Sequence, residues 1–398
     1  MAALISVDEA RALISRAIAP LGAEEISLEM AAGRVLARGV VAAIDQPPFD
    51  AAAMDGYAVR FKDAAAPGAL RVIGVSAAGA RFSGAVAPGG AVRIFTGAPM
   101  PEGANHVIIQ EETQREGDFV TISTSPSRAA NVRPAGVDFR RGDTLGRAGE
   151  RLSPRALALI AAGDVAHVAA ARRPRVGVLA NGDELRPPGR GLGPDDIVSS
   201  IPYGLRPMIE AWGGEAVDLG TARDDPDDIS SRIGTARDLD IIVPVGGASV
   251  GDRDYMRAAF HARGFTPIFE KVAIKPGKPT WFGRLEGGPF VLGLPGNPAS
   301  ALVTARIFLK TAIDCCLGGG GEDHVGLRLG APLAANGPRE TYLRAKRRAG
   351  AGGEGLVEAF ADQDSSLLGI LAASDALIRR RAGAPAAAAG EPVRCLLW

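Results

Sequence analysis

A lysine-rich segment is the part of the sequence whose residue types and spacing most directly suggest chemistry. Lys271, Lys275 and Lys278 fall within eight consecutive residues, and neighbouring prolines stiffen the backbone. A solvated basic loop is the ordinary interpretation of such a cluster, but a solvated loop needs neither the prolines nor the intervening glycine. Rigidly held ammonium groups suit a multiply charged anion, such as a pyrophosphate or an oxoanion. The segment therefore predicts a polyanion site, and it differs from a P-loop because G-x-x-x-x-G-K-[ST] is missing from the sequence.

Three polar, glycine-rich loops follow apolar runs that are typical of buried strands. They are Asn181–Glu184, Gly246–Asp252 and Leu294–Ser300. Ligands of open α/β sheets bind at the carboxyl ends of the strands, so we expect the three loops at one edge of a sheet. Each loop alone could be an ordinary turn, with Pro298 at a helix start. Together they predict a site in which backbone N–H groups, helped by Ser249, cradle a phosphate.

Carboxylates near the same loops could hold a divalent metal ion beside such a phosphate. Hard cations take oxygen ligands, often one or two carboxylates together with substrate phosphates. The candidates at strand ends are Glu184, Asp224, Asp225, Asp252 and Asp254, and those in the preceding β-rich region are Asp50, Asp55 and Asp138. For each of them alone, a structural carboxylate in a turn is the ordinary alternative.

The elements that must position these loops alternate between strand and helix from residue 174 to residue 317. The alternation predicts a mostly parallel sheet that is covered by helices on both faces. The expected strands are Arg175–Ala180, Glu215–Leu219, Asp240–Val245, Ile268–Ile274 and Phe290–Leu294, and the expected helices are Tyr203–Trp212, Pro226–Ala236, Asp254–Ala262 and Pro298–Thr311.

The flanking regions have different patterns. Ser6 and Glu9 match a capping box before an apolar stripe, which predicts an N-terminal helix that ends before Pro20. Glu25–Val41 is interpreted as a second helical or mixed segment, and Ser153 is expected to cap a helix over Pro154–Ala162. Short β-rich runs fill the rest. The expected strands are Tyr57–Arg60, Leu70–Val75, Ala91–Phe95, His106–Gln110, Phe119–Ile122, Leu327–Leu333, Thr341–Arg347, Leu356–Phe360, Ala376–Arg381 and Val393–Leu397.

Composition narrows the class of protein. The 45 Lys and Arg residues balance the 45 Asp and Glu residues, so we expect no nucleic-acid partner. The three cysteines form no C-x-x-C motif, which disfavours a zinc site. The sequence has neither a signal-peptide core at its start nor an apolar run of about 20 residues. We therefore expect a cytoplasmic protein with no membrane association.

Six motifs follow one another along the chain in a recognisable order. They are Pro47–Asp50 with Ala53–Ala58, Thr96–Ala104, Asn181–Leu185, Gly246–Gly251 with Asp254–Tyr255, Lys275–Pro279, and Gly293–Pro298. In this order they resemble the molybdopterin molybdenumtransferases, a family related to the C-terminal domain of gephyrin. The resemblance extends from about Val7 to Trp398.

The resemblance implies an architecture and a reaction. The implied fold is α/β and multi-domain: a helical linker domain (1–46 with 139–173), a β-rich insertion (47–138), a three-layer molybdopterin-binding α/β domain (174–317) and a small C-terminal β-barrel-like domain (322–398). A homodimer is implied, with the active site between the α/β domain of one subunit and the β-rich part of the other. Adenylylated molybdopterin and molybdate would yield molybdenum cofactor and AMP, with Mg²⁺. A molybdopterin adenylyltransferase and downstream molybdoenzyme chaperones are the implied partners.

The motifs also imply roles for individual residues. The implied catalytic groups are Asp55, Thr96, Asp138 and Glu184, and of these Asp55 and Glu184 are the implied metal ligands. The implied pterin pocket contains Gly246, Gly247, Ser249, Asp254, Pro295 and Pro298. The implied phosphate and oxoanion contacts are Lys271, Lys275 and Lys278, and Ser365 is a further candidate from the C-terminal domain.

The sequence departs from the family pattern at several positions. Ala51-Ala52 stands where Asn-Ser is usual, and Ser199-Ser200-Ile201 stands where Asp-Ser-Asn is usual. Asn181 replaces a common threonine, and Val245 replaces a serine. Two alternative functions therefore stay open: the adenylyltransferase of the preceding step, and a molybdopterin-binding paralogue without turnover.

Overall fold

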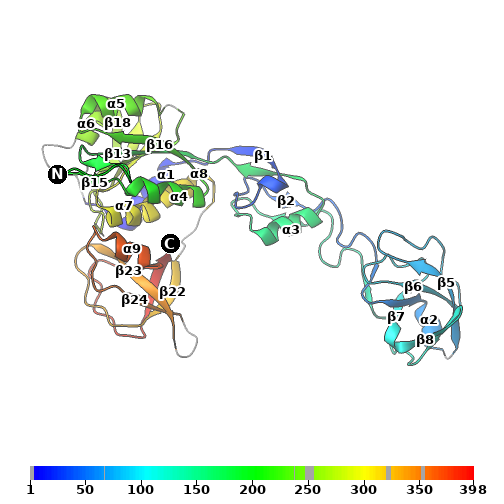
Figure 1. Ribbon diagram of the computed structural model, residues 1–398. Coiled ribbons are helices and arrows are strands. Elements are labelled where there is room, and N and C mark those ends of the chain that lie inside the picture. Colours follow the sequence, from blue (N-terminus) through cyan, green and yellow to red (C-terminus); the bar gives the residue numbers. More distant parts are fainter. Residues whose placement is uncertain (1–3, 67, 237, 247–254, 320–323, 351–354) are drawn as a thin grey trace.

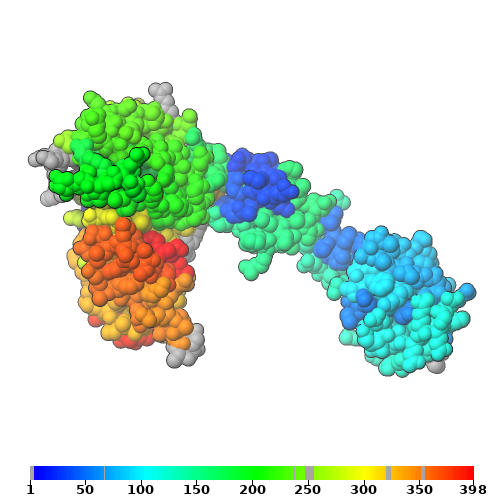
Figure 2. Space-filling model, in the orientation of Figure 1, coloured from blue at the N-terminus to red at the C-terminus, as the bar shows by residue number. Residues whose placement is uncertain are grey.

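The chain is extended in the computed structural model. A bulky part at one end contains both termini, a narrow middle part follows, and a small part lies at the other end (Figure 1; Figure 2). The structure describes residues 4–66, 68–236, 238–246, 255–319, 324–350 and 355–398.

A six-stranded mixed sheet in the bulky part confirms the predicted α/β fold. Its strands are β13 (Arg175–Asn181), β16 (Glu215–Ala222), β17 (Ile241–Val245), β18 (Phe265–Phe269), β20 (Trp281–Leu285) and β21 (Phe290–Gly293). They are ordered β16-β13-β17-β21-β20-β18, and the first four are parallel. The central strands β13 and β17 are almost entirely buried, because helices cover both faces of the sheet.

The helices form two apolar layers around this sheet. They are α1 (Val7–Ala17), α4 (Ile201–Ala211), α5 (Pro226–Gly234), α6 (Tyr255–Ala262) and a continuous helical run of α7 (Pro298–Thr304), a π segment (Ala305–Leu309) and α8 (Lys310–Cys316). One core cluster joins α5 and α6 to one face, and the other joins α1, α4, α7 and α8 to the opposite face. Ser6 caps α1 as expected, but Val7, Ala10 and Ile14 bury this helix in the α/β core. The N-terminal helix thus packs with the α/β part rather than with the linker.

The prediction of a sheet strand over Ile268–Ile274 is wrong. Strand β18 ends at Phe269, and β19 (Ile274–Lys275) pairs instead with the C-terminal barrel. Strand β20 pairs with β21 at this position of the sheet, and the sequence did not predict this strand. The segment is drawn away because Ala273 N donates to Ile5 O and Glu340 N donates to Ala273 O, at 2.7 and 2.9 Å.

The C-terminal part is a closed five-stranded barrel, which confirms the barrel-like expectation. Its strands are β22 (His324–Leu329), β23 (Glu340–Ala349), β24 (Gly355–Ala359), β25 (Ala376–Arg380) and β26 (Pro392–Leu397), and α9 (Leu368–Ala373) lies beside them. The ring closes because β23 pairs with both β24 and β25. A buried charge network fixes the barrel to α1: Arg379 donates to Glu340 at 2.8 Å and to Asp8 at 2.6 Å.

The narrow middle part is mostly β structure, so of the two interpretations of Glu25–Val41 the mixed one is confirmed and the helical one is wrong. Its elements are β1 (Ala23–Ser27), a 3-10 turn (Leu28–Met30), β2 (Val40–Val41), β11 (Thr144–Gly146), α3 (Pro154–Ala162) and β12 (His167–Ala171). Strand β1 pairs with β12, which is distant in sequence, and β2 pairs with β11. Local periodicity cannot reveal such pairings. The predicted helix over Pro154–Ala162 is present, with the Ser153 hydroxyl accepting from Ala156 N.

The distal part is a β domain with a core on each face of its sheet. Its elements are β3 (Ala51–Ala52), β4 (Gly56–Val59), α2 (Phe61–Ala64), β5 (Ala69–Ser76), β6 (Gly90–Ile94), β7 (His106–Ile109), a 3-10 turn (Gln110–Glu112), β8 (Thr113–Glu116), β9 (Phe119–Ile122) and β10 (Val132–Arg133). The main sheet is ordered β7-β4-β6-β5-β9-β8. The five strands expected here are therefore confirmed, and two separate apolar clusters make the domain a compact unit.

None of the helices in the described ranges is long and apolar enough to cross a membrane.

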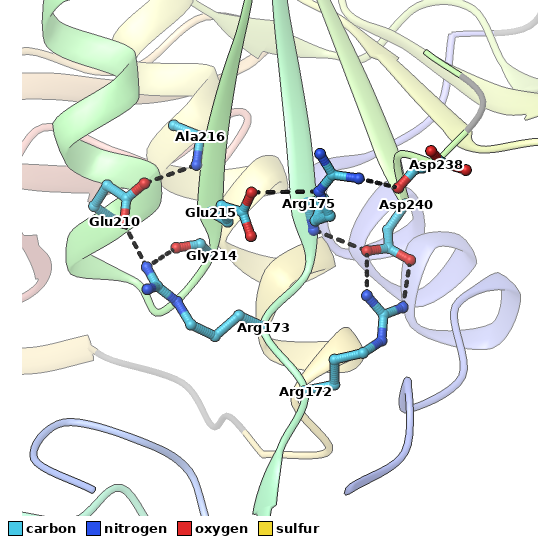
Figure 3. Close-up of polar contacts among 9 residues, drawn as sticks. All are labelled: Arg172, Arg173, Arg175, Glu210, Gly214, Glu215, Ala216, Asp238 and Asp240. Atoms are coloured by element: carbon cyan, nitrogen blue, oxygen red, sulfur yellow. Dashed lines mark hydrogen bonds and ion pairs between the residues drawn. The ribbon is translucent and has the colours of Figure 1, made fainter. Parts of the chain in front are cut away.

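Three arginines fasten the β1–β12 ribbon to the α/β sheet (Figure 3). The Arg172 guanidinium donates to both oxygens of Asp240, at 2.7 and 3.2 Å, and Arg175 N donates to the same carboxylate at 2.8 Å. This bidentate contact is the main cause of the raised pKa of Arg172. Arg173 binds Glu210 and the Gly214 carbonyl. The direction in which the ribbon leaves the sheet is therefore set by contacts between arginines after the ribbon and carboxylates of the α/β part.

Arg172→Ala is expected to lower the free energy of unfolding by about 1 kcal/mol, because a charged bidentate contact is lost at a half-exposed position. Urea unfolding followed by tryptophan fluorescence measures this, since Trp212, Trp281 and Trp398 all lie in the bulky part. Glu215→Gln is the matched control, because it weakens only the exposed contact with Arg175. An equal loss in the two variants would contradict a special role for Arg172.

Candidate functional site

The described residues of the three predicted loops meet at the carboxyl edge of the sheet, with Gly246 representing the second loop. Gly246 N donates to Leu294 O at 3.3 Å, directly after β17. The Gly296 backbone lies so close to Gly246 that an added Cβ would be 3.5 Å from the Gly246 Cα. Asn181, at the end of β13, approaches Gly246 from the other side. The parallel order β13-β17-β21 brings the loops together, as the sequence predicts.

Gly246 occupies a position that only glycine fits. Its φ of +96° is left-handed, and an added Cβ would lie 2.8 Å from the Asn181 carbonyl oxygen. The double-glycine motif therefore begins with a backbone packed against the neighbouring loop. Gly247, Ser249 and Asp254, the remaining predicted residues of this loop, lie outside the described residues.

The loop after β13 presents Glu184 to solvent. Asn181 is buried, and its side-chain amide donates to the carbonyl of Arg223 at 3.0 Å. Asp183 accepts from Asp224 N at 3.2 Å, which makes it a structural carboxylate. Glu184 is exposed, and its main chain is fixed because Ile197 N donates to its carbonyl at 2.8 Å. In this loop, Glu184 has the carboxylate that is available to a ligand.

The C-terminal barrel touches the loop that contains Pro295 and Pro298. Asn297 donates to the Ser365 hydroxyl at 3.0 Å, and Ala299 N donates to the Ser365 carbonyl at 3.0 Å. Ser365 is thus brought to the start of α7, where its sequence position alone could not place it. Pro295 is buried and Pro298 is half-buried beside it.

A buried arginine holds the loop that contains Ser365. Arg344 is 1% exposed, and its guanidinium donates to the Asp364 carbonyl at 2.8 Å and to Gln363 at 3.3 Å. Gln363 donates back to the Arg344 carbonyl at 3.0 Å. Sequence reasoning missed Asn297, Arg344 and Gln363. Of these, Asn297 alone carried a signal, because it stands inside the Pro-Gly-Asn-Pro motif.

The lysine segment lies between the α/β sheet and the barrel. Lys275 and Lys278 are exposed, and Lys271 is half-buried. Gly277, with a φ of +106°, packs against α7 so closely that a Cβ would lie 2.1 Å from the Thr304 methyl group. Within the described part of the chain, the ammonium groups of these lysines make no ion pair. The positive charges are thus held on a rigid backbone and are available to an anion.

Asp55 and Thr96 form a compact acidic site in the distal domain. Thr96 donates to Asp55 Oδ1 twice, from its hydroxyl and from its backbone N–H, both at 2.7 Å. The hydroxyl contact is the largest cause of a lowered pKa of Asp55, and the backbone contact is the second. Because both bonds end on Oδ1, the second carboxylate oxygen is left for a ligand.

Asp50 and Asp138 lie near this domain but differ in their contacts. Asp50 accepts from Ala135 N at 2.8 Å, so it has the structural role of a turn carboxylate. Asp138 is exposed, and its backbone N–H donates to Gln46 O at 3.0 Å where the distal domain joins the linker. Asp225 is also structural, because it caps α5.

The predicted catalytic residues do not meet within one chain. Strand β6, which precedes Thr96, and strand β13, which precedes Glu184, lie in parts at opposite ends of the molecule (Figure 1). Within the described ranges of the single chain, no three His, Cys, Asp or Glu side chains cluster as metal ligands would. One chain therefore presents two separate groups of candidate residues: Glu184 and the exposed lysines of the α/β part, and the distal carboxylate of Asp55.

Comparison with known families covers nearly the whole chain in three blocks. Residues 5–163 match the MoeA N-terminal region (domain I and II), residues 177–314 match a probable molybdopterin binding domain, and residues 326–398 match the MoeA C-terminal region (domain IV).

Individual relatives agree with these matches. The chain is 38% identical to a molybdopterin molybdenumtransferase of Haemophilus influenzae, over 76% of this chain and 75% of the relative. It is 32% identical to the Synechococcus elongatus molybdopterin molybdenumtransferase, over 94% of each chain. The solved molybdopterin biosynthesis moeA protein from Pyrococcus horikoshii OT3 superposes with a TM-score of 0.86 at 28% identity, with 100% of each chain covered.

Gly246→Ala is expected to destabilise the bulky part by more than the roughly 1–2 kcal/mol of a left-handed backbone, because its Cβ would also meet the Asn181 carbonyl. Gly189→Ala is the matched control, since its φ is +79° and an added Cβ would meet nothing within 4 Å. Urea unfolding of both variants by tryptophan fluorescence separates backbone strain from the steric clash. Equal losses would show that the close approach to Asn181 does not matter.

Thr96→Val is expected to raise the pKa of Asp55, because the hydroxyl donor is lost while the backbone donor is kept. Because its pKa is lowered, the Asp55 carboxyl stays ionised at pH values somewhat below 3.8, the ordinary pKa of the group. The contact with Thr96 therefore stabilises the folded protein at higher pH, and this stabilisation is lost as the pH falls through the lowered pKa. Carbon NMR titration of Asp55 in metal-free protein measures the change, with Thr96→Ser as the control. An unchanged pKa in the valine variant would contradict the hydroxyl's role.

Proposed function

The chain belongs to the molybdopterin molybdenumtransferases, and we propose that it inserts molybdenum into molybdopterin during molybdenum cofactor biosynthesis. The observation that carries the proposal is the convergence of the glycine loop, the Pro-Gly-Asn-Pro loop and the exposed lysines around one sheet and one barrel. Such an edge suits an elongated anionic ligand, because the exposed ammonium groups of Lys275 and Lys278 are held there on a restrained backbone.

We propose further that the substrate is adenylylated molybdopterin and that AMP is released. In this proposal Lys275 and Lys278 bind the phosphate groups and the incoming molybdate, and the loops at Gly246 and Pro295 hold the pterin. Cleavage of the phosphoanhydride link adds one water across the bond and gives AMP and the pterin phosphate. The protein contributes position and charge, since preorganised cations stabilise the negative charge that develops on the phosphate oxygens.

The available carboxylates suit Mg²⁺, which prefers hard oxygen donors. Asp55 has one oxygen unoccupied by Thr96, and Glu184 is exposed, so these two side chains would hold the ion. When bound, Mg²⁺ would supply charge neutralisation at the phosphate oxygens. Thr96 keeps Asp55 ionised and oriented for that role.

We propose that the complete site forms between two copies of the chain. Glu184 and Asp55 lie in parts at opposite ends of one chain, so a ligand at the sheet edge would meet the Asp55 of a second copy. A two-fold dimer would form two such sites. The extended linker suits this arrangement because it carries the distal domain away from its own α/β part.

The sequence departures do not favour a paralogue that lacks turnover. Ala51 and Ala52 are 4% and 0% exposed in a strand that pairs with β10, so they are core residues of the distal domain. Ser199 and Ile201 are both 8% exposed, and Ile201 belongs to the apolar cluster under α4. These residues are accommodated by packing, and the half-buried Asp55 and the exposed Glu184, Lys275 and Lys278 are present in this chain.

The purified protein is expected to release AMP and form molybdenum cofactor from adenylylated molybdopterin, molybdate and Mg²⁺. ATP consumption with molybdopterin alone would instead favour the adenylyltransferase. Absence of AMP release and of cofactor formation would refute the proposal.

A mixture of two inactive variants tests the shared site. Asp55→Asn and Glu184→Gln are each expected to lose most activity, while co-expression should restore about a quarter of wild-type activity, because half of the dimers are mixed and one of their two sites is intact. Activity is measured as AMP release, and size-exclusion chromatography verifies that all variants keep the same assembly. If the mixture stays as inactive as either variant alone, the proposal that Asp55 and Glu184 of one site come from two different copies is refuted.

A further inference from the structure

An exposed aromatic ring lies directly beside Asp55. The β4–β6 ladder ends with the pair Gly56 and Ile94, and Asp55 and Phe95 are the next residue on each of the two strands beyond that pair. Residues that face each other across an antiparallel pair point to the same side of the sheet. Phe95 is nevertheless 39% exposed, whereas its neighbour Ile94 is fully buried. We infer that Phe95 stacks on a planar heteroaromatic ring of the substrate, an assignment that rests on the proposed function.

The ring is supported from one side by Arg93. The Arg93 guanidinium lies 4.9 Å from the centre of the Phe95 ring and 5.3 Å from that of Tyr57. It is held there by donating to the Gly56 carbonyl at 3.0 Å and to Gln110 at 2.7 Å. Cation–π contact of this kind fixes the ring and leaves the rest of its surface to a ligand.

A single exposed phenylalanine is common on protein surfaces. Phe95 differs from such a residue because three features coincide at it. It is adjacent in sequence to Thr96, which orients Asp55; it follows the end of the β4–β6 ladder, next to which Asp55 also lies; and it is backed by a restrained cation.

The chemistry of the proposed substrate matches this surface. Adenylylated molybdopterin carries a planar adenine on one side of its phosphoanhydride link and a reduced pterin, whose pyrimidine ring is planar, on the other. A ring platform beside a carboxylate that would hold a metal–phosphate contact suits a nucleotide, in which ring and phosphate are joined. Stacking on an aromatic side chain accepts any such ring, because it needs a π face and no particular hydrogen-bond pattern.

Binding of simple probes to the full-length protein tests the inference. AMP, ribose 5-phosphate and a free pterin are titrated calorimetrically, with Mg²⁺, against the wild type, Phe95→Leu and Phe95→Trp. We expect the leucine variant to bind AMP between about five-fold and a hundred-fold more weakly, with ribose 5-phosphate unchanged and the tryptophan variant close to wild type. Phe119→Leu is the matched control, because it removes another exposed phenylalanine of the same domain.

The outcomes separate this inference from the proposed function. Weaker AMP binding in Phe95→Leu supports stacking on adenine, and weaker pterin binding with unchanged AMP binding supports stacking on the pterin. Unchanged affinity for both overturns the inference, even if the wild type turns over. An equal loss for AMP and ribose 5-phosphate also overturns it, because the effect would not depend on a ring. A wild-type protein without turnover would refute the proposed function independently of these titrations.

Discussion

The two-stranded β1–β12 ribbon is the constraint on which the rest of the structure depends. The chain crosses it twice, once to reach the distal domain and once to return to the α/β sheet. Asp240 accepts from Arg172 and from the backbone of Arg175, so the ribbon leaves the sheet in one direction (Figure 3). Arg151 adds a second tie by donating to the Gly33 and Trp212 carbonyls, at 2.7 and 2.8 Å. These contacts hold the ribbon at its base, and in the structure Asp55 and Glu184 lie in parts at opposite ends of the chain, which is the arrangement that the proposed pairing between copies requires.

The barrel is joined to the α/β part by a charge network as well as by apolar side chains such as Tyr342 and Leu377, which belong to the α/β core cluster. Arg379 is buried between Glu340 and Asp8, and a buried ion pair is costly unless its geometry is good and its other bonds are satisfied. Its hydrogen bonds also reach the second oxygen of Glu340, at 3.1 Å. Such a network fits in one orientation only, and that orientation brings β19 and Ser365 to the site. The position of Lys275 therefore depends on contacts made by residues near both ends of the chain.

Much of the α/β part could be predicted from sequence because its information is local. Strands such as Ile241–Val245 are short apolar runs, and the loops after them carry glycine and proline at positions that a turn requires. The errors concern pairings between distant segments. Glu25 lies in a strand because it pairs with Ala169, about 140 residues later in the chain. Ile274 lies outside the α/β sheet because its segment is hydrogen-bonded to Glu340 of the barrel. The contact between Asn297 and Ser365 has the same origin, since nothing near either residue indicates the other.

The carboxylates in and just before the opening motif of the distal domain differ in their hydrogen-bond donors. Asp50 accepts from Ala135 N, and Asp45 just before the motif accepts from Arg141 N, so both tie the outgoing chain to the returning chain. Asp55, a few residues later, is oriented through one oxygen and leaves the other unoccupied. The three carboxylates thus differ in their donors: Asp45 and Asp50 each accept one backbone N–H across the junction, whereas Asp55 accepts both the backbone N–H and the hydroxyl of Thr96. Sequence spacing alone cannot separate these roles, because the donors come from residues about 40 to 100 positions away along the chain.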